Sequence, residues 1–284
     1  MLITIDIGNS NIKIGFFREG HNNQVPEVRR ISLKEVQFSG GEVPVGSSKN
    51  WDSLSLKLKE LLYNVLFEKP IGGEVTVGGE VVAHGEVVVG VIISSVVPEL
   101  TEPCIRGVSG FTDRVLLMSY RLDTGLTFAI PDPSKTGPDR IAATAGAYNE
   151  FKCPLVVVDF GSATTLTVVG KGGLYLGGAI LPGVQMMAQV LHQETGLLPK
   201  IEPSLEGLEP VGKETVSAIN SGIIYGTAGA IERLRSEFEK ELGYRLLLIT
   251  TGGNAFLIEP YIKVDQRRPY LVLEGLKLIF ERNV

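Results

Sequence analysis

The sequence predicts an α/β protein of two similar domains with a nucleotide-binding cleft between them. The first observation is a repeated pattern of an apolar run, Asp, one apolar residue, Gly and small polar residues, which occurs as LITIDIGNSNI at 2–12 and as LVVVDFGSATT at 155–165. Each apolar run has the composition of a buried strand, and each polar cluster has that of a tight turn. The second observation is that strands and helices alternate after both copies, as they do in α/β proteins. The third is the Asp that ends each run, because a buried carboxylate needs a metal, a donor or a substrate to satisfy it.

Composition is that of a soluble globular protein, with 44% hydrophobic and 21% charged residues among 284. The formal net charge of -5 offers no basic field for a nucleic acid. The most apolar stretch, residues 87–97, is too short to span a bilayer, and no secretory signal is recognisable. With only Cys104 and Cys153 as cysteines, a disulfide scaffold is not expected, and we predict a cytoplasmic protein. The three histidines are scattered and do not suggest a metal site.

The first domain is expected to span residues 1–150. It begins with a hairpin of two strands at 2–7 and 12–17, and it has a helix at 51–67 whose apolar residues recur with a helical period. The elements expected after them are strands joined by glycine turns at 69–90, a buried strand at 88–97, an element that starts at Pro98, a short strand within 113–119, a loop at 131–133 and an Ala-rich helix at 140–151.

The second domain, residues 151–284, is expected to repeat this plan. Its predicted elements are a hairpin of strands at 155–159 and 165–169, a turn at 177–183, a helix near 184–195, helices within 215–242, a strand at 246–250 and a final helix at 270–280.

The first polar turn has the residue types of a phosphate loop. Gly8 is expected to let the backbone approach a ligand and to adopt a positive φ. The following N–H groups and short side chains can bind phosphate oxygens, Lys13 can add a positive charge, and Asp6 can hold a hydrated Mg²⁺. An ordinary β-hairpin turn has the same composition, and for one copy alone we favour that simpler interpretation.

Three further motifs carry possible chemistry. Asp159, Gly161 and Ser162 repeat the first turn with hydroxyls in place of amides. The sequence TGGN at 251–254 follows a predicted strand, and its two glycines would allow a flat ring such as adenine to pack on the backbone. The third motif, GPDR at 137–140, opens the Ala-rich helix, where composition alone favours Asp139 as a helix cap.

In this order, the motifs resemble those of the type III pantothenate kinases over nearly the whole chain. The matching pieces are DIGNSNIK at 6–13, SSVVP at 94–98, DPSKTGPDR at 132–140, VDFGSATT at 158–165, GGAILPG at 177–183, ETVSAINSG at 214–222 and TGGN at 251–254. That family belongs to the superfamily of acetate and sugar kinases, Hsp70 and actin. The resemblance therefore implies two actin-like domains of the ribonuclease H-like type. The first would carry one phosphate loop, and the second would carry the other phosphate loop and the adenosine motif.

The implied reaction is the ATP-dependent phosphorylation of pantothenate to 4'-phosphopantothenate, the first step of coenzyme A synthesis. Asp139 would be the general base. The implied ATP-binding residues are Asp6, Ile7, Gly8, Asn9, Ser10, Asn11, Ile12, Lys13, Ser162, Gly252 and Gly253. The implied pantothenate-binding residues are Gly137, Pro138, Asp139, Arg140 and Thr215, with Thr215 supplied by the partner subunit of a homodimer.

The resemblance also implies two cations. Asp159 would bind a monovalent cation, K⁺ or NH₄⁺, and Asp6 would hold Mg²⁺ through water. Two positions depart from the family pattern, since Ile130 stands where Tyr is expected and Ser162 where Thr is usual. The first change removes a hydroxyl and stacking surface from the pantothenate site, and the second removes only a methyl.

Two alternatives to this kinase stay open. One is a non-catalytic ATP-binding regulator of the same fold, since a fold does not determine a function. The presence of Asp6, Asp139 and Asp159 together argues against it. The other is a different small-molecule kinase, or a phosphatase, of the superfamily, which the Ile130 departure keeps open.

Overall fold

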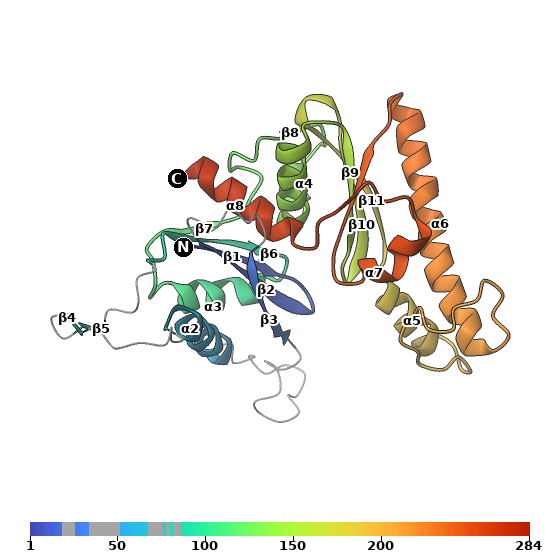
Figure 1. The fold of residues 1–284 in the computed structure, drawn as a ribbon, viewed down its shortest axis with the longest axis horizontal. Helices are drawn as coiled ribbons and strands as arrows, with labels where there is room; N and C mark the ends of the chain where they lie inside the picture. The colour runs from blue at the N-terminus through green and yellow to red at the C-terminus, as the bar shows by residue number, and fades with distance from the viewer. Residues whose placement is uncertain (19–25, 34–51, 68–75, 78–79, 82–86) are drawn as a thin grey trace. The chain divides into compact units, whose positions relative to one another are not determined.

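Two mixed sheets organise the chain (Figure 1). The computed structural model describes residues 1–18, 26–33, 52–67, 76–77, 80–81 and 87–284. The first sheet has the order β3-β2-β1-β6-β7. Its strands are β1 (Leu2–Ile7), β2 (Asn11–Phe17), β3 (Glu27–Ser32), β6 (Gly90–Ser95) and β7 (Val115–Leu117). The expected first hairpin is confirmed, because β1 and β2 pair antiparallel.

The second sheet has the order β13-β12-β9-β10-β11-β8. Its strands are β8 (Thr127–Phe128), β9 (Leu155–Phe160), β10 (Ala163–Val169), β11 (Leu174–Pro182), β12 (Leu247–Thr251) and β13 (Gln266–Arg267). Here β9 and β10 form the second predicted hairpin.

Five strands of the second sheet correspond to the five of the first, and β8, which pairs with β11, has no counterpart. In the first, β1 pairs antiparallel with β2 on one side and parallel with β6 on the other. In the second, β9 pairs antiparallel with β10 and parallel with β12. The outer neighbours match as well, because β3 and β11 are antiparallel additions while β7 and β13 are parallel ones. The predicted α/β class with two similar halves is therefore confirmed.

Helices cover one face of each sheet and build its core. Alternate residues of β1, Ile3, Ile5 and Ile7, pack with apolar residues of α2 (Asp52–Phe67) and α3 (Pro98–Val108). Val156, Val158 and Phe160 of β9 pack in the same way with α5 (Val184–Gln193) and α6 (Thr215–Leu242). Because side chains alternate across a strand, Asp6 and Asp159 lie on the opposite faces from these clusters.

The other face of the first sheet packs against the last helix, α8 (Leu271–Asn283). A β-carbon at Gly90 would overlap the ring of Phe280, and one at Gly15 would lie 3.2 Å from Leu273. In Figure 1, α8 lies on the side of this sheet away from α2 and α3. The helix that carries the GPDR motif is α4 (Pro138–Phe151), and the short elements are α7 (Ala255–Ile258), η1 (Pro133–Lys135), η2 (Lys171–Gly173) and η3 (Glu259–Tyr261).

Contacts divide the chain into two compact units that are not contiguous in sequence. One consists of residues 1–123, 136–142 and 272–284, and the other of 124–135 and 143–271. The final helix thus belongs with the first sheet. The sequence-based division of the chain into domains at residues 1–150 and 151–284 remains a prediction.

Two sequence-based expectations need correction. The predicted turn at 177–183 is wrong, because residues 177–182 belong to β11 and only Gly183, the N-cap of α5, lies outside it. Gly177 and Gly178 have φ values of 98° and 153°, and a β-carbon at Gly178 would overlap the carbonyl of Leu166 on β10. The glycines therefore allow an irregular, closely paired strand beside the register shift at Val168 and Val169. The second correction concerns strands that are absent from the prediction, namely β3 and the two-residue strands β8 and β13.

The glycine-rich stretch at 69–90 lies largely outside the described residues. Two-residue strands β4 (Thr76–Val77) and β5 (Glu80–Val81) pair antiparallel within it. The helix predicted at 51–67 is observed at 52–67 and the buried strand predicted at 88–97 at 90–95, and α3 starts at Pro98 as predicted.

Candidate functional site

The end of β1 carries a charged pair. Asp6 and Lys13 are direct partners across the β1–β2 hairpin, so their side chains share one face of the sheet. Lys13 Nζ lies 3.8 Å from Asp6 Oδ2, and Asp6 is only 7% exposed. A carboxylate this well covered needs compensating charge or hydrogen bonds, and Lys13 supplies part of that compensation.

The turn between these strands presents polar groups to solvent. The Gly8 N–H donates to the Asn11 carbonyl at 3.0 Å, and Asn9, Ser10 and Asn11 are exposed. Gly8 is not among the glycines with positive φ, so that expectation is wrong. A β-carbon there would lie 3.4 Å from its nearest neighbour, the Asn11 carbonyl oxygen, so the turn itself does not force glycine at this position.

Asp139 stands in the first turn of α4. Pro138 is the first helical residue, where its missing N–H is not needed. The Gly137 carbonyl accepts the N–H groups of Arg140 at 3.1 Å and Ile141 at 3.2 Å. Asp139 Oδ1 accepts the Arg140 N–H at 2.8 Å. Asp139 thus binds one free N–H of its helix terminus, as a cap would, although it lies inside the helix.

The surroundings of Asp139 favour its protonated form. Burial raises the pKa of this carboxyl above its usual value, and the effect is opposed by the Arg140 N–H and by the charges of Arg140 and Lys13. Lys13, the partner of Asp6 in the hairpin, therefore also acts electrostatically on Asp139. The first unit thus brings together the residues from two separate motifs, Asp6 and Lys13 from one and Asp139 and Arg140 from the other.

Helix α8 fixes the start of α4. A β-carbon at Gly275 would overlap the carbonyl oxygen of Ala142, so the two helices pack with their backbones close together. Ala142 lies one turn after Asp139. The packing of α8 therefore helps to position the first turn of α4, which carries Asp139, and this contact cannot be recognised from local sequence.

The second polar turn is arranged like the first. Asp159 pairs with Thr165 on β10 and with Thr251 on β12. The Gly161 N–H donates to the Ala163 carbonyl at 3.1 Å, and Ser162 is exposed. Where the first turn has Lys13 opposite the Asp, the second has Thr165, so the two copies differ by one positive charge.

Gly252 packs directly on this second turn. Its φ is 97°, and a β-carbon would overlap Asp159 Oδ1 and lie 2.6 Å from the Phe160 nitrogen. Gly183, at the start of α5, is likewise close to the backbone of Ser162. Gly253 is exposed with no atom near its missing β-carbon. The second unit thus brings Asp159, Ser162 and Gly252 together.

Thr215 and Ile130 lie elsewhere in the second unit. Thr215 is the exposed first residue of α6, next to Glu214, whose N–H donates to Ser217 Oγ at 3.1 Å. Ile130 is half-buried and follows β8, with its Cγ2 3.5 Å from where a β-carbon of Gly177 would be.

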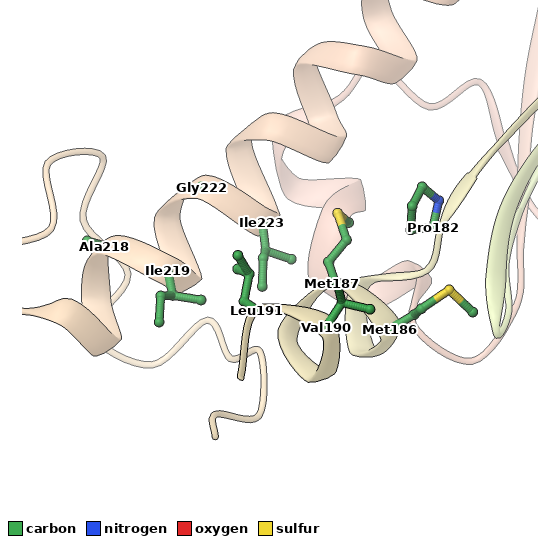
Figure 2. Close-up of a pocket in the computed structure, with 9 residues that line it drawn as sticks. All are labelled: Pro182, Met186, Met187, Val190, Leu191, Ala218, Ile219, Gly222 and Ile223. Carbon is green, nitrogen blue, oxygen red and sulfur yellow. The ribbon is translucent and has the colours of Figure 1, made fainter. Parts of the chain in front are cut away.

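An apolar pocket of about 480 Å³ lies between α5 and α6 (Figure 2). In Figure 2, Met187 of α5 and Ile223 of α6 point toward one another. The lining residues are Pro182, Met186, Met187, Val190, Leu191, Ala218, Ile219, Gly222 and Ile223. A site for a nucleotide needs convergent polar groups, so this pocket is not the predicted ATP site.

Cation-binding groups at the two turns are single carboxylates. Within the described part of the chain, no group of three or more His, Cys, Asp or Glu residues could hold a metal ion. A lone carboxylate suits Mg²⁺ that keeps most of its water, which fits Asp6. The carboxylate of Asp159 lies where a β-carbon of residue 252 would be if that residue were not glycine. Thr251 is the strand partner of Asp159. These are oxygen donors of the kind that alkali cations accept.

Comparison with known proteins gives a consistent family. The family model for type III pantothenate kinase matches residues 74–237. The chain is 32% identical to the type III pantothenate kinase of Moorella thermoacetica, covering 100% of both chains. It is 30% identical to that of Syntrophobacter fumaroxidans, covering 100% of this chain and 98% of the relative. With the enzyme of Listeria monocytogenes it is 37% identical over 68% of this chain and 75% of the relative.

Solved structures agree on the fold. A Baf family protein from Campylobacter jejuni has a TM-score of 0.56 and 18% identity, covering 99% of this chain and 98% of that one. The ethanolamine utilization protein EutJ from Carboxydothermus hydrogenoformans has a TM-score of 0.51 and 16% identity, covering 98% of this chain and 89% of that one. At such low identity these likenesses concern architecture alone.

Proposed function

The chain belongs to the type III pantothenate kinase family, and from this premise we propose that Asp139 is the base that receives the proton of the pantothenate hydroxyl. The chain is a kinase that phosphorylates pantothenate with ATP, a reaction of coenzyme A synthesis. The observation that carries the assignment of Asp139 is its environment, a half-buried carboxyl with a raised pKa beside the charges of Arg140 and Lys13.

The reaction transfers the γ-phosphoryl group of ATP to a hydroxyl of pantothenate. The hydroxyl oxygen of pantothenate attacks the γ-phosphorus of ATP, the bond from that phosphorus to the β–γ bridging oxygen breaks, and ADP leaves. The hydroxyl proton passes to the Asp139 carboxylate. Because phosphoryl transfer depends on alignment and on neutralising charge over the phosphate oxygens, a positioned carboxylate and nearby cationic side chains are the groups expected.

The ATP phosphates would lie along the two polar turns. In the first, the exposed residues Asn9, Ser10 and Asn11 offer amide and hydroxyl groups, and Lys13 offers a positive charge. In the second, exposed Ser162 offers a hydroxyl. Gly253 is open enough for an adenine ring to pack on its backbone, whereas Gly252 is already occupied by its contact with Asp159.

Two cations complete the proposal. Asp6 would hold Mg²⁺ through water, and Asp159 would bind K⁺ or NH₄⁺ beside Thr251. When bound, these ions offset the negative charge of the phosphates. Lys13 lies on the Asp6 side, and its counterpart at Asp159 is the neutral Thr165.

Pantothenate would be bound by Gly137, Pro138 and Arg140, with Thr215 supplied by a second copy of the chain. An apolar surface beside Thr215 supports such a dimer, since Met186, Val190 and Val216 are 43%, 47% and 50% exposed. Exposed apolar groups that gather on neighbouring helices often mark an interface. Ile130 would leave the pantothenate site without the hydroxyl of a Tyr.

A cytoplasmic location also stays a proposal. Both cysteines are free, as is usual in a reducing compartment. No helix in the described ranges is long and apolar enough to cross a membrane.

The test is ATP consumption with and without pantothenate, in potassium and in sodium buffers. We expect consumption to require pantothenate and to be faster in potassium. Consumption that does not depend on pantothenate would remove the proposed site chemistry and favour another kinase. ATP binding without any consumption would favour a regulator. If ATP consumption requires pantothenate but is equally fast in the two buffers, the role of Asp139 is unaffected and the cation role of Asp159 is contradicted.

A further inference from the structure

Ser94 carries a buried hydroxyl that has no role in the proposed reaction. It is the fifth residue of β6 and belongs to the SSVVP segment that the sequence analysis singled out. Its side chain is 0% exposed, and Ser94 Oγ has no hydrogen-bond partner within the part of the chain that the structure describes. A buried hydroxyl without a partner is unfavourable, so this position calls for an explanation.

The rest of the segment already has a structural explanation. Ser95 Oγ donates to the Val97 carbonyl at 3.0 Å and accepts the Thr101 hydroxyl at 2.8 Å. Pro98 is the first residue of α3. Ser95 and Pro98 therefore define the start of that helix, and Ser94 is the polar residue that remains.

The strand register puts Ser94 beside Asp6. The two residues are direct partners in the parallel pairing of β1 with β6. Paired residues in a sheet point to the same face, and neighbouring strands lie about 4.8 Å apart. On its other side Asp6 pairs with Lys13. Lys13, Asp6 and Ser94 thus form a row of three polar side chains across the ends of adjacent strands.

The second sheet repeats this arrangement. Asp159 is the parallel partner of Thr251 on β12, as Asp6 is of Ser94 on β6. Each of the two carboxylates at the strand ends therefore has a hydroxyl residue as its neighbour on the parallel side. On the antiparallel side the two differ, with Lys13 in one and Thr165 in the other. The hydroxyl neighbour is the feature that both turns share.

We propose that Ser94 is a positioning residue for the divalent cation, and that its hydroxyl binds a water of the hydrated ion held at Asp6. This inference rests on the proposed role of Asp6. Mg²⁺ keeps most of its waters and is held by few direct protein ligands. Groups that bind those waters orient the ion and contribute to its affinity. An oxygen on the strand beside the carboxylate, buried and without a partner among the residues that the structure describes, is suited to that task.

The test measures metal binding directly. Mn²⁺ is titrated into the protein with a non-hydrolysable ATP analogue, and free Mn²⁺ is followed by electron paramagnetic resonance. Because loss of an outer-shell partner typically weakens metal affinity about 10-fold or more, Ser94→Ala should raise the Kd for Mn²⁺ by that factor. In the kinase assay the same variant should raise the KM for MgATP more than it lowers kcat.

Thr4→Val is the matched control. Thr4 Oγ1 is also buried without a partner among the described residues, and it lies on the same face of β1 two residues before Asp6. It lies beside α8, since a β-carbon at Gly15 would lie 2.7 Å from Thr4 Oγ1 and 3.2 Å from Leu273. Its removal should leave the Kd for Mn²⁺ unchanged. Both variants should melt no lower than the wild type without metal, because each loses an unsatisfied group.

Each outcome decides the inference. Equal Mn²⁺ affinity in the wild type and Ser94→Ala overturns it and leaves the kinase proposal untouched. Equal weakening of Mn²⁺ binding in Ser94→Ala and Thr4→Val also overturns the inference, because it indicates a general loosening of the structure around the sheet. If the wild type binds no Mn²⁺ with the analogue, the role of Asp6 itself is wrong. Should Ser94→Ala fail to fold, Ser94→Cys replaces it, since the near-isosteric thiol is a poor acceptor and should weaken Mn²⁺ binding too.

Discussion

Asp139 combines two requirements that oppose each other. It must be ionised to accept a proton, yet it is held where burial raises its pKa. The same burial makes the carboxylate a stronger base, because basicity increases with pKa. The N–H and charge of Arg140, together with the charge of Lys13, limit the shift. The position of one side chain at a helix terminus thus controls how readily it takes up a proton.

Replacing Asp139 by Asn should separate binding from turnover. The amide keeps the size of the side chain but cannot accept the proton. We expect kcat to fall by about 10²–10⁴-fold, with the Kd for ATP changed little. Steady-state kinetics and calorimetric titration with ATP measure the two effects. Near-normal turnover in Asp139→Asn would contradict the assignment of the base.

The same variant should change how stability depends on pH. A carboxyl whose pKa is raised in the folded state binds more protons folded than unfolded between the two pKa values. Its contribution to stability is therefore present below the unfolded pKa and lost as the pH rises through the folded pKa. Asp139→Asn removes that loss, so the variant should gain stability relative to the wild type as the pH rises from about 3. Denaturant titrations across that pH range measure the free energy of unfolding of each protein. If this free energy depends on pH in the same way in both proteins, the raised pKa of Asp139 is contradicted.

At the scale of elements, closely packed glycines determine where strands and helices meet. Gly178 allows β11 to approach β10, and Gly275 allows α8 to approach the start of α4. Neither effect can be recognised from local sequence, because each depends on a residue far away in the chain. Both glycines lie within regular elements, where glycine is otherwise unfavourable.

Gly178→Ala should destabilise the second unit strongly. The new methyl would overlap the Leu166 carbonyl, and the φ of 153° is unfavourable for alanine. We expect a loss of at least about 2 kcal/mol in the free energy of unfolding. Gly172→Ala is the control, since its φ is 71° but nothing lies within 4 Å. It should lose only about 1 kcal/mol. Equal losses in denaturant titrations would mean that the contact with Leu166 has no effect.

Most elements could be predicted because their patterns are local. The two hairpins, α2, α5 and α8 follow from apolar periodicity and turn residues. β3 was missed because it is a polar edge strand, in which Arg29 and Arg30 are exposed and Ile31 is the buried residue. β11 was mistaken for a turn because consecutive glycines usually mark one. In each case tertiary pairing outweighed the local composition.

The site residues were predictable as motifs but not as neighbours. The sequence indicates Asp6 and Asp139 separately, and only the folded first unit makes Lys13 act on both. Ser94 and Thr251 could not be assigned from spacing. Their roles depend on which strands pair in parallel and in which register. The glycine motif after β12 proved partly structural, because Gly252 packs on Asp159.

At the scale of the whole molecule, the proposed dimer leads to a complementation test. If Thr215 acts in the site of the partner subunit, Asp139→Asn and Thr215→Val are each defective alone. Mixed dimers, formed by unfolding and refolding the two variants together, contain one site with both native residues. We expect an equal mixture to recover about a quarter of wild-type kcat, from random pairing of subunits into closed dimers. If Thr215 acts within its own subunit, mixing restores nothing.

The last helix also affects how the chain can fold while it is being made. Residues 272–284 belong to the unit of the first sheet, where Phe280 and Leu273 pack at Gly90 and Gly15. A ribosome releases the chain from its N-terminus, and domains generally fold in the order in which they emerge. Here the strands of the first sheet are made early, but α8 is made only after every strand of the second sheet. The core of the first unit therefore lacks its covering helix until residues 272–284 have been made, whereas all strands of the second sheet precede that helix in the chain.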